Sequence, residues 1–231
     1  NWSKEWPPQD WPPIQWKMQT GGAVIEQVIV KTTAPSETIK VLFLSANPTN
    51  TDRLKLDEEV RAIKHVLVHA NIGDRITFVS EWALRINELS EYLLRHQPTI
   101  VHFSGHGSVE GKLIFKDERG DAFDVPIEAL SRLFAICKNN IRCVLLNACY
   151  SITQAEAIAQ HIDVVIGMPT EIDDNAAQEF AAEFYKGLVY KRNVQECFDL
   201  GCVAIDLHKL TKFCEPRLVC LRYDPKHLYL A

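Results

Sequence analysis

Two stretches of the chain decide its fold: TIVHFSGHGS at residues 99–108 and IRCVLLNACYS at residues 141–151. Each begins as an apolar run, which is typical of a strand buried on both faces of a sheet. Each then changes abruptly to small and polar residues. Functional groups of open α/β sheets collect at the carboxyl ends of the strands, so these two ends are where we look for chemistry.

Outward from these stretches, apolar runs alternate with segments of helical periodicity. The pattern predicts a small hairpin at 112–125 and strands at 39–45, 75–80, 99–104, 141–148, 163–168 and 217–223. Helices are expected at 57–69, 86–95, 126–138, 153–160, 175–190 and 194–209. Because parallel neighbours need helical crossovers, this alternation predicts an α/β fold with a mostly parallel sheet and helices on both faces.

The bulk composition narrows the functional classes. The 231 residues suit one well-buried domain, and a net charge of −5 gives no reason to expect nucleic acid or an anionic membrane surface as a partner. No apolar run approaches the roughly 18–20 residues of a membrane span, and no secretory signal is visible. Seven cysteines without a CxxC motif indicate reduced thiols, so we expect a cytoplasmic protein.

The first 38 residues differ from the rest and contain WPPQDWPPIQW at 6–16. Adjacent prolines exclude helix and favour an extended chain. We interpret residues 1–38 as an arm packed along the domain or a linker, or alternatively as a partner-docking segment, with a possible edge strand at 23–30. The main domain is then expected at 39–231.

The two strand ends carry a candidate nucleophile and base. Glycines flank His106, which lets the backbone turn sharply and leaves the ring exposed, and the small Ala148 gives access to Cys149. His106 would take the thiol proton and later protonate the leaving amine, while the N–H groups of Gly107 and Cys149 would face the oxyanion. Taken singly, a buried cysteine is usually a small apolar residue and a histidine a structural group; the combination favours catalysis.

The strings HFSGHG and LLNACYS together resemble the CHAT family of caspase-like peptidases, and residues 41–63 and 164–188 are similar to this family as well. The resemblance implies a caspase–hemoglobinase-like three-layer sandwich and a cysteine endopeptidase with His106 as base and Cys149 as nucleophile. It also implies a protein substrate, an activating or sensor protein or domain, and a role in bacterial defence or cell death. No QAC-x-G surrounds Cys149, so caspase specificity for aspartate is not expected.

Substrate choice is open at the level of sequence. Asn147 precedes Cys149 by two residues, and we expect it to point into the primary specificity pocket and to contact the substrate. The similar metacaspases carry an acidic residue there, which pairs with arginine or lysine. Because Asn147 is neutral, the carboxylates of Asp173 and Asp174 are the alternative ligands for a basic side chain. Either of them could instead cap the helix that follows. Our working hypothesis is cleavage after a basic residue.

Other functions are weaker. A catalytically silent scaffold that binds partner proteins is the main alternative. His65 and His69 have a metal-compatible spacing but lack the glutamate of a zinc peptidase, and a His102/His106/Cys149 metal site is conceivable. Neither GxxxxGK nor GxGxxG is present. We therefore expect no metal and no cofactor.

Overall fold

The computed structural model describes residues 38–69, 75–210 and 215–230. The predicted N-terminal arm, except for its last residue, and its possible strand at 23–30 lie outside the described residues. The described strands are β1 (Ile39–Ala46), β2 (Ile76–Glu81), β3 (Ile100–Gly105), β4 (Ile114–Lys116), β5 (Ala122–Asp124), β6 (Cys143–Asn147), β7 (Val164–Gly167) and β8 (Arg217–Val219). The α-helices are α1 (Leu56–His69), α2 (Leu89–His96), α3 (Ile127–Cys137), α4 (Ile152–Ile158), α5 (Asp174–Val189) and α6 (Val194–Leu207).

A six-stranded sheet runs through the middle of the domain in the order β2-β1-β3-β6-β7-β8. All neighbours in it are parallel except β8, which is antiparallel to β7. The short strands β4 and β5 form a separate antiparallel hairpin whose turn contains Gly120 in a left-handed conformation (φ 90°). The predicted α/β fold with a mostly parallel sheet is therefore confirmed.

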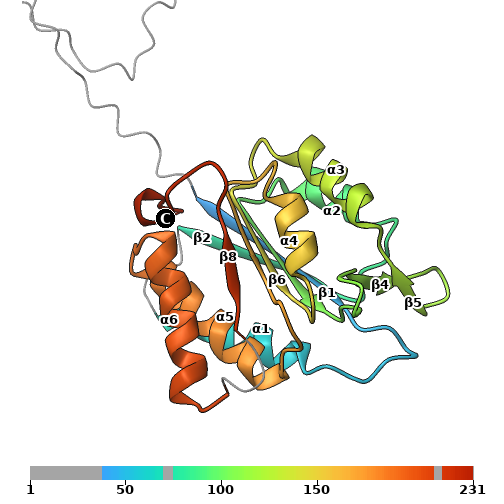
Figure 1. The fold of residues 1–231 in the computed structure, drawn as a ribbon, viewed down its shortest axis with the longest axis horizontal. Helices are drawn as coiled ribbons and strands as arrows, with labels where there is room; N and C mark the ends of the chain where they lie inside the picture. Colours follow the sequence, from blue (N-terminus) through green and yellow to red (C-terminus); the bar gives the residue numbers. More distant parts are fainter. Residues whose placement is uncertain (1–37, 70–74, 211–214, 231) are drawn as a thin grey trace, which may run out of the picture. The chain divides into compact units, whose positions relative to one another are not determined.

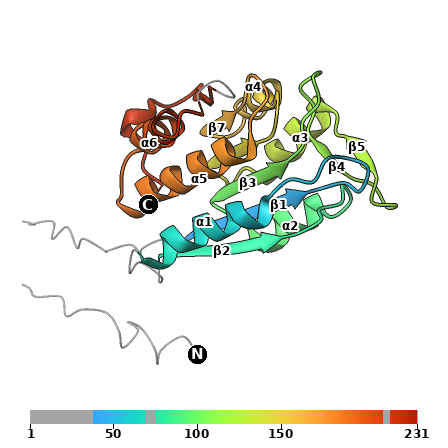
Figure 2. The same cartoon turned by 90° about the horizontal axis from the view of Figure 1, so that it is seen from below.

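Helices cover both faces of this sheet. Figure 1 shows α1, α5 and α6 on one side and α2, α3 and α4 on the other, and Figure 2 shows the same layers after a quarter turn. The predicted helices and strands of the described ranges are all present, with ends that shift by a few residues. None of the helices in these ranges combines the length and the apolar character that a membrane crossing requires.

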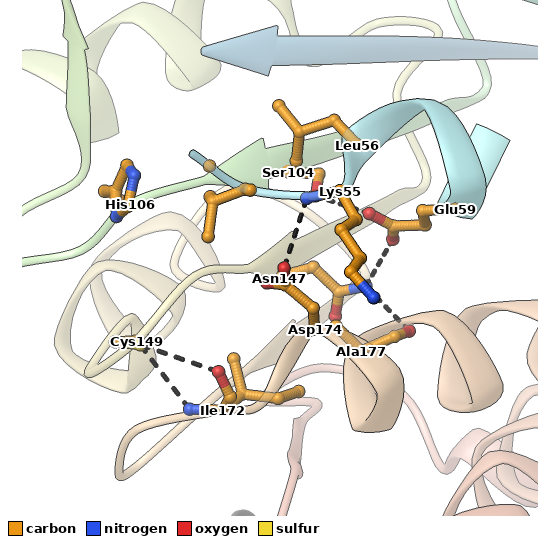
Figure 3. Close-up of a pocket in the computed structure, with 12 residues that line it drawn as sticks. Lys55, Leu56, Glu59, Ser104, His106, Asn147, Cys149, Ile172, Asp174 and Ala177 are labelled. Atoms are coloured by element: carbon orange, nitrogen blue, oxygen red, sulfur yellow. Dashed lines mark hydrogen bonds between the residues drawn. The ribbon is translucent and has the colours of Figure 1, made fainter. Parts of the chain in front are cut away.

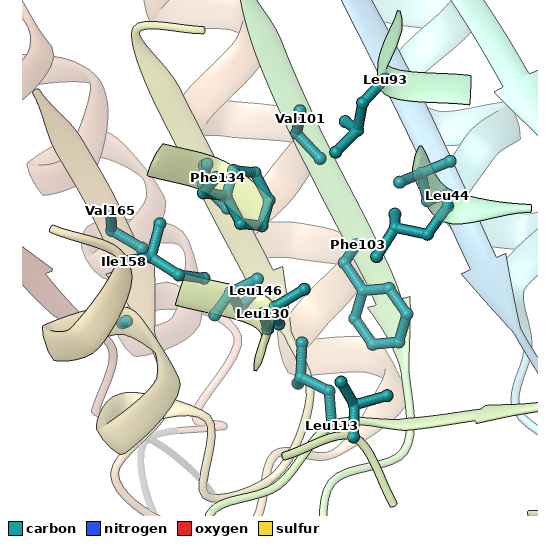
Figure 4. Close-up of a cluster of buried hydrophobic side chains, with 14 of the residues drawn as sticks. Leu44, Leu93, Val101, Phe103, Leu113, Leu130, Phe134, Leu146, Ile158 and Val165 are labelled. Carbon is teal, nitrogen blue, oxygen red and sulfur yellow. The ribbon is translucent and has the colours of Figure 1, made fainter. Parts of the chain in front are cut away.

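The period-two alternation of the strands divides the core into two halves. On β1, Leu42 and Leu44 belong to the half beneath α2, α3 and α4, whereas Val41 and Phe43 belong to the half beneath α1, α5 and α6. Figure 4 shows the first half, in which Phe103 of β3 and Phe134 of α3 are among the buried rings. Burial on both faces explains why these strands are apolar without interruption.

The parallel pairing of β3 and β6 sets the register of the two stretches that we singled out. Ser104 lies opposite Asn147 at the carboxyl end of the pair. His106 and Cys149 follow these two residues by the same number of positions. The register therefore delivers the candidate base and nucleophile to the same edge of the sheet.

The contact between α5 and α6 generates a stability prediction. A Cβ atom at Gly201 of α6 would lie 2.6 Å from the Phe180 ring of α5. Replacing glycine by alanine ordinarily stabilises a helix. At this position we expect Gly201→Ala to lower the free energy of unfolding by about 1–3 kcal/mol through overpacking, measured by urea titration. The control Val203→Ala, at a half-exposed site of α6, should change it by no more than about 0.5 kcal/mol. A more stable Gly201→Ala protein would contradict the packing.

Candidate active site

The two motifs meet at the carboxyl edge of the sheet. The Gly107 backbone packs so closely against Cys149 that a Cβ atom at position 107 would lie 1.9 Å from the Cys149 carbonyl oxygen. Only glycine fits such an approach without a shift of the backbone. The flanking glycine that the sequence suggested as an aid to exposing His106 thus also brings the histidine loop against the cysteine loop.

His106 is held by a backbone carbonyl. Its Nε2 atom lies 2.8 Å from the carbonyl oxygen of Asp52, in the loop between β1 and α1. A carbonyl only accepts hydrogen bonds, so Nε2 carries a hydrogen, and in the neutral ring Nδ1 is left with a free lone pair. The loop is itself tied down, because Thr49 N donates to Gly120 O and Ala122 N donates to the side chain of Asn50. The neutral imidazole is therefore held in the tautomer whose Nδ1 is able to accept a proton.

Cys149 is half-buried in surroundings that disfavour its thiolate. The N–H of Ile172 donates to its Sγ atom at 3.5 Å, as the dashed lines in Figure 3 show. Burial raises the pKa of the Cys149 thiol most; the N–H groups of Ile172 and Cys149 lower it, the Glu171 and Asp174 carboxylates raise it, and the pKa lies above its ordinary value. In the described part of the chain no hydrogen bond joins His106 to Cys149. The thiol therefore needs a base before it can act as a nucleophile.

In the described ranges, two backbone N–H groups near the thiol have no backbone acceptor. The N–H groups on either side are engaged: Ser108 N donates to Lys112 O, and Tyr150 N donates to Thr170 O. By contrast, within the described ranges the N–H groups of Gly107 and Cys149 donate to no backbone carbonyl, and the Cys149 N–H interacts with the thiol of its own side chain. Tyr150 adopts a left-handed conformation (φ 54°), an uncommon state for a residue with a side chain. These are the two donors that the sequence suggested for an oxyanion.

A pocket lies beside Cys149, and Glu59 of α1 contributes to its lining. Glu59 is buried, yet its carboxylate accepts hydrogen bonds from Ser104 Oγ (2.5 Å) and Asn147 Nδ2 (2.6 Å). His102 Nε2 lies 3.1 Å from the same carboxylate. Burial raises the pKa of Glu59, but His102 and the two hydrogen bonds lower it by more, so the pKa lies below its ordinary value. Glu59 is therefore a buried anion within this pocket.

The other predicted site residues divide into two groups. Asn147 and Asp174 line the pocket, and Asp174 Oδ2 accepts a hydrogen bond from Lys55 N at 3.1 Å. Asp173 instead caps α5, because its side chain accepts from Asn175 N at 2.9 Å. Of the two carboxylates proposed for a substrate, only Asp174 belongs to the pocket.

Two elements of the site are absent from the sequence-based prediction. The backbone carbonyl of Asp52 could not be predicted from the sequence, because every residue has a backbone carbonyl. Glu59 has a weak signal: it lies in the apolar-periodic stretch of 56–69, at a position that the helix buries. Among Asp57, Glu58 and Glu59 in the first turn of α1, only the fold distinguishes the buried carboxylate from its exposed neighbours.

The described residues offer no metal centre. No group of three or more histidine, cysteine, aspartate or glutamate side chains in these ranges is arranged to hold an ion. His102, which the sequence allowed as a ligand beside His106 and Cys149, is fully buried. Its Nδ1 atom lies 3.2 Å from the Tyr185 hydroxyl, and its Nε2 faces Glu59. Both ring nitrogens of His102 therefore face protein groups of the core.

The environment of Cys149 yields a prediction about its ionisation. Alkylation of Cys149 by iodoacetamide, followed by peptide mass spectrometry, should rise with pH through an apparent pKa above the ordinary value of about 8.5. Glu171→Gln should lower that apparent pKa, because it removes a carboxylate that disfavours the thiolate. Glu156→Gln, at an exposed position of α4, is the matched control and should leave it unchanged. An apparent pKa well below 8.5 would contradict this account and indicate a resting thiolate–imidazolium pair.

Two curated relatives match this chain over about 170 residues. A "Probable protease" of Gillisia limnaea is 25% identical, over 73% of this chain and 30% of its own length. A "Roc-COR-CHAT protease" from an unknown prokaryotic organism is 23% identical, over 71% of this chain and 16% of its own length. The chain therefore spans less than a third of the length of either relative.

Solved structures of two cysteine-peptidase groups share the fold. Caspase-1 from Spodoptera frugiperda superposes with a TM-score of 0.53 at 11% identity, covering 80% of this chain and 86% of the caspase chain. A secreted C11 cysteine protease from Bacteroides thetaiotaomicron, bound to an irreversible peptide inhibitor, gives a TM-score of 0.58 at 9% identity, covering 79% and 66%. The fold is thus caspase-like. The model of the CHAT domain matches residues 23–199, which is most of the chain, and the chain belongs to the CHAT domain family.

Proposed function

We propose that this domain is a cysteine endopeptidase in which Cys149 is the nucleophile and His106 the general base. The observation that carries the proposal is the contact of Gly107 with the Cys149 backbone, which brings the two loops together at the edge of the sheet. The contact of the imidazole with the Asp52 carbonyl and the two N–H groups without a backbone acceptor, those of Gly107 and Cys149, add to it. Family membership and the names of the two relatives point the same way.

The first half of the reaction forms an acyl-enzyme. The Cys149 thiol gives its proton to Nδ1 of His106 while its sulfur attacks the carbonyl carbon of the scissile peptide bond. The N–H groups of Gly107 and Cys149 stabilise the resulting oxyanion; such a donor is worth ~10²–10³-fold in rate. The intermediate then collapses, the C–N bond breaks, and the imidazolium protonates the departing amine.

The second half regenerates the enzyme. A water molecule gives a proton to His106 and attacks the thioester carbonyl carbon. Collapse of this intermediate breaks the S–C bond, releases the carboxylic acid product and returns the proton to Cys149. The carbonyl of Asp52 keeps the ring in the same tautomer in both halves, because it accepts from Nε2 throughout.

The domain acts, in this proposal, as the effector part of a larger system. Both relatives are several times longer than the matched region, and the name of one joins CHAT to Roc and COR. We therefore propose a protein substrate and an activating or sensor protein or domain as partners. A role in bacterial defence or cell death is the extension that the family resemblance suggests.

The proposal is tested by paired substitutions at the two motif residues. Cys149→Ala should abolish hydrolysis of a fluorogenic peptide library, and His106→Ala should slow it by about 10²–10⁴-fold, because the thiol loses its base. Cys137→Ala, at another partly buried free cysteine, should retain activity.

Retained hydrolysis in Cys149→Ala would sink the proposal. If the unmodified chain cleaves nothing and Cys149 does not react with thiol-directed electrophiles, the silent scaffold becomes the better interpretation. A reactive Cys149 without cleavage would indicate an enzyme that needs its activator.

A further inference from the structure

The polar groups of the pocket beside Cys149 are organised to accept hydrogen bonds. Both hydrogens of the Asn147 amide are used, one by Glu59 Oε1 and one by the carbonyl of Ala177 at 3.1 Å. The Ser104 hydroxyl donates to Glu59. What remains of Asn147 is its Oδ1 atom, which is buried and has no partner in the described part of the chain. An amide flipped by 180° would direct Oδ1 at two acceptors, so the hydrogen bonds fix this orientation.

The pocket also contains two carboxylates. Glu59 and Asp174 both line it, and the lowered pKa of Glu59 keeps that carboxylate ionised at neutral pH. Glu59 lies in the first turn of α1, where the helix dipole further favours a negative charge. Lys55 also lines the pocket; its Nζ atom lies 3.8 Å from Glu58, and more than half of its side chain is exposed.

Apolar side chains surround these acceptors. Leu54, Leu56 and Ile172 line the same pocket. Cys149 and His106 also line it, so the pocket lies next to the proposed reacting atoms (Figure 3). Apolar side chains together with anionic acceptors match a long aliphatic stem that ends in a cation. A buried acceptor without a partner costs free energy in the empty pocket, and an N–H donor of such a cation would satisfy it.

On the basis of the proposed peptidase function, we propose that this pocket binds the arginine or lysine side chain of the substrate residue whose carbonyl Cys149 attacks. Glu59 is the specificity-determining residue, assisted by Asn147 Oδ1 and Asp174. His102 is a positioning residue, because it contacts the Glu59 carboxylate from within the core and does not line the pocket. Metacaspases carry an acidic residue at the position of Asn147; in this chain Glu59 of α1 supplies the carboxylate instead.

The test uses peptide acyloxymethyl ketones that differ only in the residue next to the ketone: arginine, lysine, citrulline or aspartate. In this reaction the Cys149 sulfur bonds to the methylene carbon, the carboxylate leaves, and the thiol proton passes to solvent. Labelling rates of the whole chain are followed by mass spectrometry of the intact protein and of the Cys149 peptide. The readout therefore needs no turnover.

We expect the arginine and lysine probes to label Cys149 at least about tenfold faster than citrulline, the neutral counterpart of arginine. Glu59→Gln should reduce that ratio to near one, and Asp174→Asn should reduce it partly. Because Glu59 is buried, the folding of Glu59→Gln is first checked by circular dichroism. If Glu59→Gln misfolds, Asp174→Asn, at the other carboxylate that lines the pocket, still tests the proposal. Glu58→Gln makes the same chemical change at an exposed position one residue earlier and should keep the full ratio.

Equal rates for arginine and citrulline, a faster aspartate probe, or no labelling by any probe while iodoacetamide still reacts with Cys149 would overturn the basic pocket. Labelling of Cys149 by a neutral or acidic probe would at the same time leave the peptidase function standing. Failure of iodoacetamide as well as the probes at Cys149 would reject the peptidase function and the pocket that rests on it.

Discussion

The in-register parallel pairing of β3 and β6 is the constraint on which the site depends. It places Ser104 opposite Asn147 and sends His106 and Cys149 out of the same edge of the sheet. Hydrogen bonds along the pair and side chains buried on both faces hold that register, since a slip by one residue would turn each apolar side chain to the opposite face. Gly107 then completes the approach, because a side chain there would collide with the Cys149 carbonyl.

The second organising element is the buried carboxylate of Glu59. Removing a carboxylate from water costs several kcal/mol, and the protein offsets this with the hydroxyl of Ser104, the amide of Asn147 and the imidazole of His102. Ser104 and Asn147 are the residues opposite each other at the end of β3 and β6. The same pairing that positions the proposed nucleophile and base therefore also assembles the polar side of the pocket. Glu59 of α1 connects that pocket to the core through its contact with the buried His102.

The sequence allowed the fold and the two motif residues to be predicted, because both rest on local patterns. Continuous apolar runs identify buried strands, and strands that alternate with helices leave few topologies open. The environment of the site was harder to predict. Asp52 contacts His106 through its backbone carbonyl, which any residue could provide. Glu59 is an acidic residue like its neighbours Asp57 and Glu58, and only its place on the buried face of α1 distinguishes it. Asp173 and Asp174 are adjacent and chemically alike, yet one caps α5 and the other lines the pocket.

The most direct test of the central claim is a crystal structure of the chain labelled by the arginine acyloxymethyl ketone. We expect a bond between the probe and Sγ of Cys149, with the ketone oxygen within hydrogen-bond distance of the Gly107 and Cys149 N–H groups. His106 should keep Nε2 on the Asp52 carbonyl and face the sulfur with Nδ1, and the guanidinium should contact Glu59. A label on another cysteine, or a ketone oxygen directed away from both N–H groups, would contradict the account.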